Sequence, residues 1–364
     1  MRHFFSSLIF FIKIIFRKQS VDVLFYYPHH FNRGDNSENM YFQHLYKSCI
    51  KNNLSYLIFE EPDFKNSNYK RSKLSVPFDF IYVIIILLRK LNLSDKNIGK
   101  ILSVTFLRGL TFKNYIVLSQ SMFTVFRHVC PQAKLFDLQH GIIHKDQLSY
   151  IKDNMVADNI SKNNVYLLLF GHKFKNILIE NDHSKYFSKS ISVIGANLKK
   201  SLVLHNKFNQ SILVTMQFTD DHSFDENQIL FYDLVKYVEK NLDYLFILRN
   251  HPRFNDNIDL GILLRFNNVR LSSSSLYDDF KFCSIHLTSY STSVIESARY
   301  GIPTIFLRSL DNYSNIFLKQ YHYPFFDSIG SIEKDYRIAS SKVLNWQKDF
   351  ICDFDQNKFI SLLS

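Results

Sequence analysis

TSYSTSVIESARYGIPTIFL, residues 288–307, leads from the end of an apolar strand through a run of hydroxyl side chains into a helix and then, after Gly-Ile-Pro, into another strand. Strand–loop–helix–strand units of this kind build α/β proteins with parallel sheets. The N-terminus of a helix carries unpaired backbone N–H groups and a partial positive charge. Ser291, Thr292 and Ser293 add hydroxyl groups at that point, so the segment predicts a phosphate-binding site.

Glu296 lies three residues after Ser293, and two interpretations of this spacing stay open. A serine followed by a glutamate at that distance can form a capping box at a helix N-terminus. Alternatively, the Glu296 carboxylate contacts sugar hydroxyl groups of a bound ligand.

The same alternation of apolar strands and helices runs through the whole chain. A polar, basic stretch at 197–210 has no periodicity of its own and is interpreted as a linker. We therefore predict two α/β domains, 1–200 and 201–364, each with a parallel sheet whose ligands bind at the carboxyl ends of its strands. The predicted strands lie at 21–27, 55–59, 114–118, 134–138, 165–170 and 192–194, and then at 211–216, 243–248, 269–271, 284–288 and 304–307.

A second strand end in the later domain carries His251-Pro252, flanked by Arg249 and Arg253. Proline restricts the residue before it, so His251 is held at the end of the strand. An imidazole there can donate to a phosphate oxygen, and guanidinium groups pair with phosphate in a bidentate manner. We predict that these residues and Gln217, which follows the first strand of this domain, contact a phosphorylated ligand. A surface-turn histidine is the alternative for His251.

The first domain contains Gln139-His140-Gly141 at a strand end. We expect Gly141 to permit a tight turn that turns His140 toward a ligand, where a neutral imidazole suits a general base. A buried structural histidine is the alternative. Asp35 or Glu38, in the loop after the first strand, is the rival base.

Together, Q-H-G, H-P and S-x-S-T-S-x-x-E-x-x-x-x-G-x-P resemble the GT-B glycosyltransferase superfamily. More narrowly, they resemble bacterial capsule and lipopolysaccharide enzymes, including sialyl- and Kdo-transferases, and CDP-glycerol glycerophosphotransferases. The resemblance implies two Rossmann-like domains whose parallel sheets face each other across a cleft, with the nucleotide-sugar donor on the second domain. It also implies that His251, Ser291 and Ser293 bind the donor phosphate and that His140 is the base.

The expected function is transfer of a sugar, for example a CMP-linked acidic sugar, to a lipid-linked or growing surface polysaccharide. Two alternatives stay open: a CDP-polyol phosphotransferase of the teichoic-acid type, and a non-catalytic subunit of a polysaccharide assembly complex. The teichoic-acid enzymes usually have tryptophan before the histidine-glycine pair, and Leu138-Gln139 stands there instead. We expect no cofactor and no metal, because the class does not need one and the spacing of His29 and His30 fits no metal motif.

The chain of 364 residues has a formal net charge of +11, which fits nucleic acid, an anionic membrane or phosphorylated substrates. No nucleic-acid-binding signature accompanies the charge, so no nucleic-acid partner is expected. Its four cysteines are far apart in the sequence, as is usual for free thiols in a reducing cytoplasm.

Residues 4–16 form an aromatic-rich apolar run that is too short to span a bilayer and is followed by Arg17 and Lys18. We predict that residues 1–18 form a helix on the anionic inner face of the cell membrane. A helix packed on the first domain is the alternative. The predicted location is therefore cytoplasmic, peripheral to the membrane.

Overall fold

The computed structural model describes residues 2–32, 38–64, 71–197, 203–254, 257–307 and 314–364. The chain forms two compact units: unit 1 is Met1–Leu198 with Cys352–Ser364, and unit 2 is Lys199–Ile351. The prediction placed residues 352–364 in the second domain, which is wrong, because this segment packs within unit 1.

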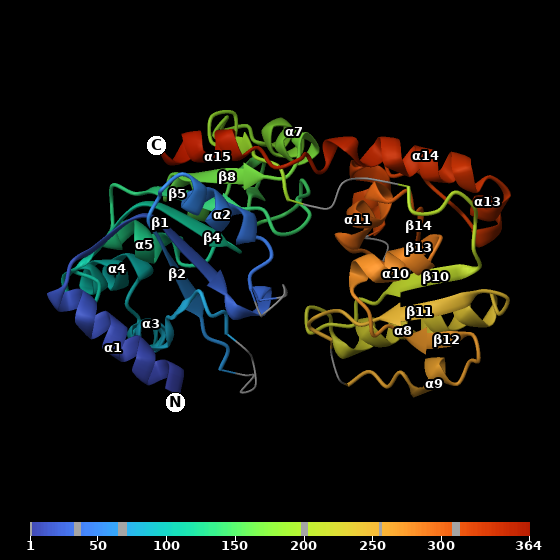
Figure 1. Ribbon diagram of the computed structural model, residues 1–364, viewed down its shortest axis with the longest axis horizontal. Helices are drawn as coiled ribbons and strands as arrows, with labels where there is room; N and C mark the ends of the chain where they lie inside the picture. Colours follow the sequence, from blue (N-terminus) through green and yellow to red (C-terminus); the bar gives the residue numbers. More distant parts are fainter. Residues whose placement is uncertain (1, 33–37, 65–70, 198–202, 255–256, 308–313) are drawn as a thin grey trace. The chain divides into compact units, whose positions relative to one another are not determined.

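Among the described residues, the main sheet of unit 1 has seven strands, all parallel, in the order β3-β2-β1-β4-β5-β8-β9 (Figure 1). Val23 of the interior strand β1 lies between Tyr56 of β2 and Asn114 of β4. Residues 23–27 are fully buried, as expected for a parallel strand covered on both faces. The strands are β1 Gln19–Pro28, β2 Tyr56–Glu61, β3 Val76–Pro77, β4 Leu110–Leu118, β5 Lys134–Leu138, β8 Val165–Leu169 and β9 Ile191–Val193, with a separate antiparallel pair, β6 Ile151–Lys152 and β7 Met155–Val156.

Helix α1 packs on unit 1, as the alternative interpretation of residues 1–18 predicted. Phe11 and Ile14 are buried, and the Ser7 hydroxyl accepts a hydrogen bond from the Phe80 amide at 3.1 Å. A Cβ at Gly109 would clash with the backbone carbonyl of Ile14. In the part of the chain that the structure describes, no helix combines the length and the apolar character needed to cross a membrane.

The C-terminal helix α15 shows why the chain end belongs to unit 1. Phe359 and Leu363 are buried in the same apolar core as Val23 of β1. Gly195 has a φ of +75°, and a Cβ there would clash with the Asp353 carbonyl, so glycine lets this segment approach. The helices of unit 1 are α1 Arg2–Phe16, η1 His29–Phe31, α2 Gln43–Lys51, α3 Asp79–Lys90, α4 Asp95–Val104, α5 Phe123–Val129, α6 Asp158–Ser161, α7 His172–Asn181 and α15 Gln356–Leu363.

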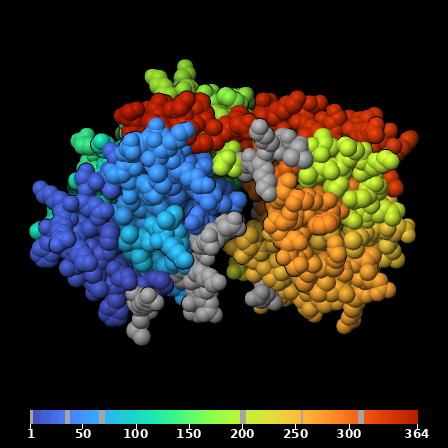
Figure 2. Space-filling model, viewed as in Figure 1, coloured from blue at the N-terminus to red at the C-terminus, as the bar shows by residue number. Residues whose placement is uncertain are grey.

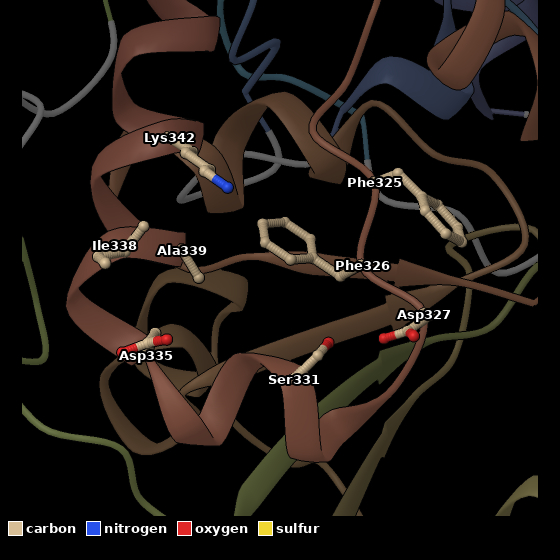
Figure 3. A pocket seen from close by; sticks show the side chains of 8 residues that line it. All are labelled: Phe325, Phe326, Asp327, Ser331, Asp335, Ile338, Ala339 and Lys342. Atoms are coloured by element: carbon tan, nitrogen blue, oxygen red, sulfur yellow. The ribbon is translucent and has the colours of Figure 1, made fainter.

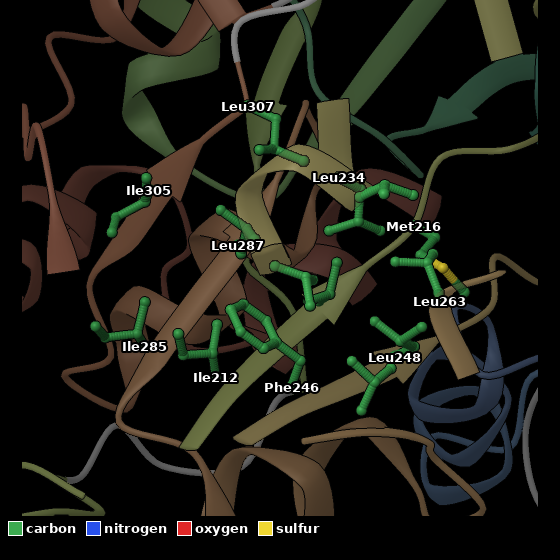
Figure 4. Packing of buried hydrophobic residues seen from close by; sticks show 14 of the residues in the cluster. Ile212, Met216, Leu234, Phe246, Leu248, Leu263, Ile285, Leu287, Ile305 and Leu307 are labelled. Carbon is green, nitrogen blue, oxygen red and sulfur yellow. The ribbon is translucent and has the colours of Figure 1, made fainter. Parts of the chain in front are cut away.

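Unit 2 has a five-stranded sheet in its described residues, again all parallel, in the order β12-β11-β10-β13-β14. Its core is built from alternating strand residues such as Ile212, Phe246, Leu248 and Leu287 (Figure 4). The strands are β10 Ser211–Thr215, β11 Leu245–Arg249, β12 Val269–Leu271, β13 Ile285–Thr288 and β14 Thr304–Phe306, and the helices are α8 Phe224–Glu239, α9 Gly261–Leu264, α10 Leu276–Phe282, α11 Ser293–Arg299, η3 Ile316–Gln320, α13 Ile329–Lys334, α14 Tyr336–Trp346 and η4 Gln347–Asp349.

Candidate functional site

Each sheet has one place where the strand order reverses direction. In unit 2 this point lies between β10 and β13, and in unit 1 it lies between β1 and β4. Open parallel sheets bind ligands outside the carboxyl ends of the strands at such points. The predicted site residues follow these strand ends in both units.

The hydroxyl-rich loop joins β13 to α11 in unit 2. Ser291 is half-buried and its Oγ accepts a hydrogen bond from the Ser293 amide at 3.2 Å, while Thr292 is exposed. Ser293 is buried, and its Oγ lies 3.1 Å from Thr215 Oγ1 on β10. Ser291 and Thr292 are therefore at the surface of the loop, whereas the Ser293 hydroxyl faces inward.

A buried histidine that the sequence analysis missed lies beneath this loop. His286 of β13 is fully buried, and its Nε2 lies 2.8 Å from Thr215 Oγ1 and 3.3 Å from Ser293 Oγ. Its Nδ1 lies 2.9 Å from Thr304 Oγ1 on β14. Burial lowers the pKa of His286 to about 3, so the ring is neutral and joins three hydroxyl groups. The signal in the sequence was a histidine inside an otherwise apolar strand.

Glu296 does not cap α11, so the capping-box interpretation is wrong. Thr292 occupies the N-cap position, and its side chain makes no capping hydrogen bond. Burial raises the pKa of the Glu296 carboxyl to about 7, and the charges of Arg249 and Arg299 act against that rise. Within the described residues, the carboxylate accepts no hydrogen bond. It is thus an acceptor group without a partner in the first turn of the helix.

The basic residues after β11 are held by acidic partners. Arg249 pairs with buried Asp279 at 2.9 Å and donates to the Ser274 carbonyl at 2.7 Å. Arg253 forms an exposed ion pair with Asp221. His251 is half-buried, and its Nδ1 accepts a hydrogen bond from the Arg253 amide at 3.1 Å, which fixes the ring on the loop.

Gln217 follows β10 and is buried, which leaves little of its side chain for a ligand. The same loop carries His222, whose Nε2 lies 2.6 Å from the hydroxyl of Tyr290 in the hydroxyl-rich loop. This contact, which the sequence did not reveal, joins the loops that follow β10 and β13. The two loops on either side of the reversal point are therefore held together.

In unit 1, His140 follows β5. Its Nε2 lies 3.2 Å from the Ser119 hydroxyl at the end of β4, and its ring contacts Phe31 edge to face at 5.2 Å. Gly141 is not in the left-handed region, and a Cβ there would meet nothing within 4 Å. The expected need for glycine at this turn is therefore wrong, although His140 does lie at a strand end beside the reversal point.

The rival bases are only partly described. Asp35 lies outside the described residues. Glu38 accepts a hydrogen bond from the Gln43 side chain at 3.2 Å. Within the described residues, no group of three or more His, Cys, Asp or Glu side chains could hold a metal ion. One D-x-D triplet, a pattern that can bind divalent cations, occurs at 353–355, and its Asp355 caps α15 by accepting from the Lys358 amide at 2.9 Å.

A hollow of about 350 Å³ lies elsewhere on unit 2, between the segment around Phe326 and the helices α13 and α14 (Figure 3). Phe325, Ile338 and Lys342 are among the residues that line it. None of the predicted site residues does. The hollow is therefore separate from the site predicted at the strand ends.

No protein-family model and no curated protein matches the chain. Solved structures do match it over nearly its whole length. The UDP-GlcNAc 2-epimerase of Neisseria meningitidis has 13% identity and a TM-score of 0.55, covering 94% of this chain and 99% of its own. That of Methanocaldococcus jannaschii has 13% identity and a TM-score of 0.58, covering 95% and 99%. The wall teichoic acid polymerase TagF has 13% identity and a TM-score of 0.53, covering 100% and 97%.

Identities this low show the fold alone. These neighbours are GT-B enzymes, and the chain has the same fold, with two parallel α/β sheets. The GT-B fold that the motifs predicted is confirmed.

Proposed function

We propose that the chain is an enzyme that takes a nucleotide-activated sugar and transfers the sugar to a glycan or lipid-linked glycan of the cell surface. The observation that carries the proposal is the carboxyl edge of the unit 2 sheet, where Ser291, Thr292 and the unpartnered carboxylate of Glu296 lie at the reversal point. The neighbours of the same fold support a nucleotide ligand, since both epimerase structures contain bound UDP-GlcNAc.

On the donor side, the loop and the amides at the start of α11 suit the phosphates. His251 would donate to the leaving phosphate, and as imidazolium it would neutralise the charge that develops there. Glu296 would accept hydrogen bonds from sugar hydroxyl groups. His286 and Ser293 would hold the loop from beneath. Because Arg249 and Arg253 are already paired with Asp279 and Asp221, we assign them a supporting role.

On the acceptor side, His140 would act as the general base that removes the proton from the attacking hydroxyl group. Its strand-end position and its contact with Ser119 support this role. Asp35 and Glu38 remain the rivals. We further propose that transfer does not require a divalent ion, so an excess of EDTA should leave turnover unchanged.

The test begins with a thermal-shift screen against CMP-, CDP-, UDP-, GDP- and dTDP-linked donors, because a ligand that binds the native state raises its melting temperature. With the donor so found, His251→Ala should abolish nucleotide release and keep the fold. His205→Ala is the matched control, since its Nε2 bonds the Phe280 carbonyl outside the site. Normal turnover in His251→Ala would overturn the donor-site assignment.

A second candidate is transfer of a polyol phosphate from a CDP-polyol. The similarity to TagF over the whole chain favours it. Incubation with CDP-glycerol and a glycan acceptor separates the two functions: release of CMP with glycerol phosphate on the acceptor supports the second. Binding of donors without any turnover would instead indicate a non-catalytic subunit.

For the location, we propose that unit 1 lies on an anionic inner membrane surface through α1, which is exposed in the space-filling view (Figure 2). Phe5, Ile9, Ile12 and Phe16 recur along one side of this helix and are 55%, 54%, 42% and 79% exposed. Exposed Lys13 lies on the same helix, and Arg17 and Lys18 follow it, which suits anionic lipid.

Cosedimentation with phosphatidylglycerol vesicles tests this location. The double substitution Phe5→Ser and Phe16→Ser should release the protein from the vesicles. Phe282→Ser is the control, because Phe282 is 56% exposed but lies in unit 2. Equal binding of the wild type, the double variant and Phe282→Ser would exclude α1 as the anchor.

A further inference from the structure

The turn after β4 in unit 1 has an unusual backbone. Ser119, Gln120 and Met122 have φ values of 60°, 55° and 61°. Residues other than glycine seldom adopt this left-handed region, because Cβ approaches the backbone. Such strained positions persist only where the surrounding structure holds them, and they cluster at functional sites.

A buried carboxylate holds this turn. Asp137 of β5 is 1% exposed, and its Oδ1 accepts a hydrogen bond from the amide of Gln120 at 3.3 Å. Its Oδ2 accepts one from the hydroxyl of Tyr150 at 2.9 Å. The Gln120 side chain donates to the Ser149 carbonyl at 3.0 Å. The left-handed turn is therefore tied to the neighbouring strand and to the segment before β6.

This backbone turn places the Ser119 hydroxyl group beside His140, the predicted base. Ser119 Oγ lies 3.2 Å from His140 Nε2, and the left-handed conformation of Ser119 and Gln120 sets its direction. A hydroxyl group can donate to an imidazole nitrogen or accept from it, so the direction in which Ser119 Oγ is held biases the tautomer of the ring. Asp137 does not contact His140 itself, because successive residues of a strand point to opposite faces and the two residues are three positions apart.

We propose that Asp137 and Ser119 are positioning residues for His140: Asp137 fixes the strained turn through the Gln120 amide, and Ser119 then holds the orientation of the imidazole and biases its tautomer. Only the role of His140 as a base rests on the proposed function. The positioning itself is a property of unit 1. Burial raises the pKa of the Asp137 carboxyl to about 7 despite its two hydrogen bonds, which shows that the carboxyl is kept in a place that disfavours its charge.

Nitrogen-15 NMR of the full chain labelled at histidine tests the proposal, because the shifts of the two ring nitrogens report the tautomer. His140→Asn identifies the His140 signals. Ser119→Ala should change the tautomer ratio of His140 by roughly 5- to 10-fold, the equilibrium effect of one hydrogen bond. Asp137→Ala should do the same, whereas Asp137→Asn, which keeps an acceptor for the Gln120 amide, should preserve the wild-type ratio.

Ser121→Ala is the matched control, because no hydrogen bond of its hydroxyl occurs in the described residues of this turn. If Asp137→Ala does not fold, the His140 tautomer ratios of Ser119→Ala and Asp137→Asn still test the proposal. An unchanged ratio in Ser119→Ala, or a changed ratio in Asp137→Asn, would overturn the proposal. A changed ratio in Ser119→Ala with normal turnover would instead overturn the role of His140 as the base and leave the positioning intact.

Discussion

Replacing Glu296 with Gln should stabilise unit 2 at pH 8 and weaken donor binding. Burial raises the pKa of this carboxyl from 4.5 to about 7. At about 1.36 kcal/mol per pKa unit, the difference corresponds to at most ~3.4 kcal/mol. Glu296 is half-buried rather than fully buried, so water screens part of this penalty, and we expect the glutamine variant to gain ~1–2 kcal/mol.

The sign of the pH dependence follows from the direction of the shift. The folded chain holds this proton more tightly than the unfolded chain, so the contribution of Glu296 is most favourable below pH 4.5 and is lost as the pH rises through about 7. The gain of the variant should therefore vanish toward pH 4.5. Differential scanning calorimetry at pH 5, 6, 7 and 8 should show a melting-temperature increase that grows to roughly 2–8 °C.

Glu226→Gln is the matched control, since Glu226 lies in the first turn of α8 in the same unit. Its carboxylate completes a capping box with Ser223, and hydrogen bonds from Ser223 lower its pKa. This variant should be less stable at pH 8. Calorimetric titration with the donor should show roughly 10- to 100-fold weaker binding to Glu296→Gln, because a hydrogen bond to a charged group is lost. A stability gain independent of pH would refute the reasoning.

Three further changes follow. His286→Ala should lower the free energy of unfolding, measured in urea, by ~2–4 kcal/mol, because Thr215, Ser293 and Thr304 lose their common partner and a cavity remains. In the wild type, the contribution of His286 to stability should fall as the pH drops from 6.5 toward about 3. His140→Ala should lose about 10²–10⁴-fold in turnover while nucleotide binding survives, and intact turnover would exclude it as the base. Gly301→Ala should cost ~1–2 kcal/mol, because the φ of Gly301 is +71°, and an unchanged unfolding midpoint would contradict this.

Much of the fold could be predicted because parallel strands are apolar runs. Residues 134–138 and 211–216 stand out against polar neighbours, and the structure has β5 at Lys134–Leu138 and β10 at Ser211–Thr215. The destination of α15 could not be predicted. Phe359 and Leu363 mark an amphipathic helix, but an apolar face does not tell which of two cores it joins. The close approach of Asp353 to Gly195, which brings the C-terminal segment to unit 1, can be seen only in the folded structure.

The strand-end motifs could be predicted because they are local in the sequence. Ser291, His251 and His140 all lie directly after strands, as expected. The residues that support these motifs could not be predicted, because the contacts of the supporting residues join strands that are distant in the sequence. His286 meets Thr215 from another strand, and Asp137 reaches the Gln120 amide across the β4–β5 pair. A polar residue inside an apolar strand signals that a partner must exist, but not which one.

Asp137, which is buried, and Glu296, which is half-buried, both have a carboxyl pKa near 7 but differ in a way that bears on their roles. Asp137 already accepts two hydrogen bonds, so it is satisfied without a ligand and suits positioning. Glu296 accepts none within the described residues, although burial makes its charge costly. Hydroxyl groups of a bound donor would stabilise that charge and lower its pKa, since hydrogen bonds to the charged form favour it. Donor binding near pH 7 should then release a proton, which calorimetric titration in buffers of different ionisation enthalpy measures. Binding without proton release in the wild type would mean that Glu296 does not contact the donor.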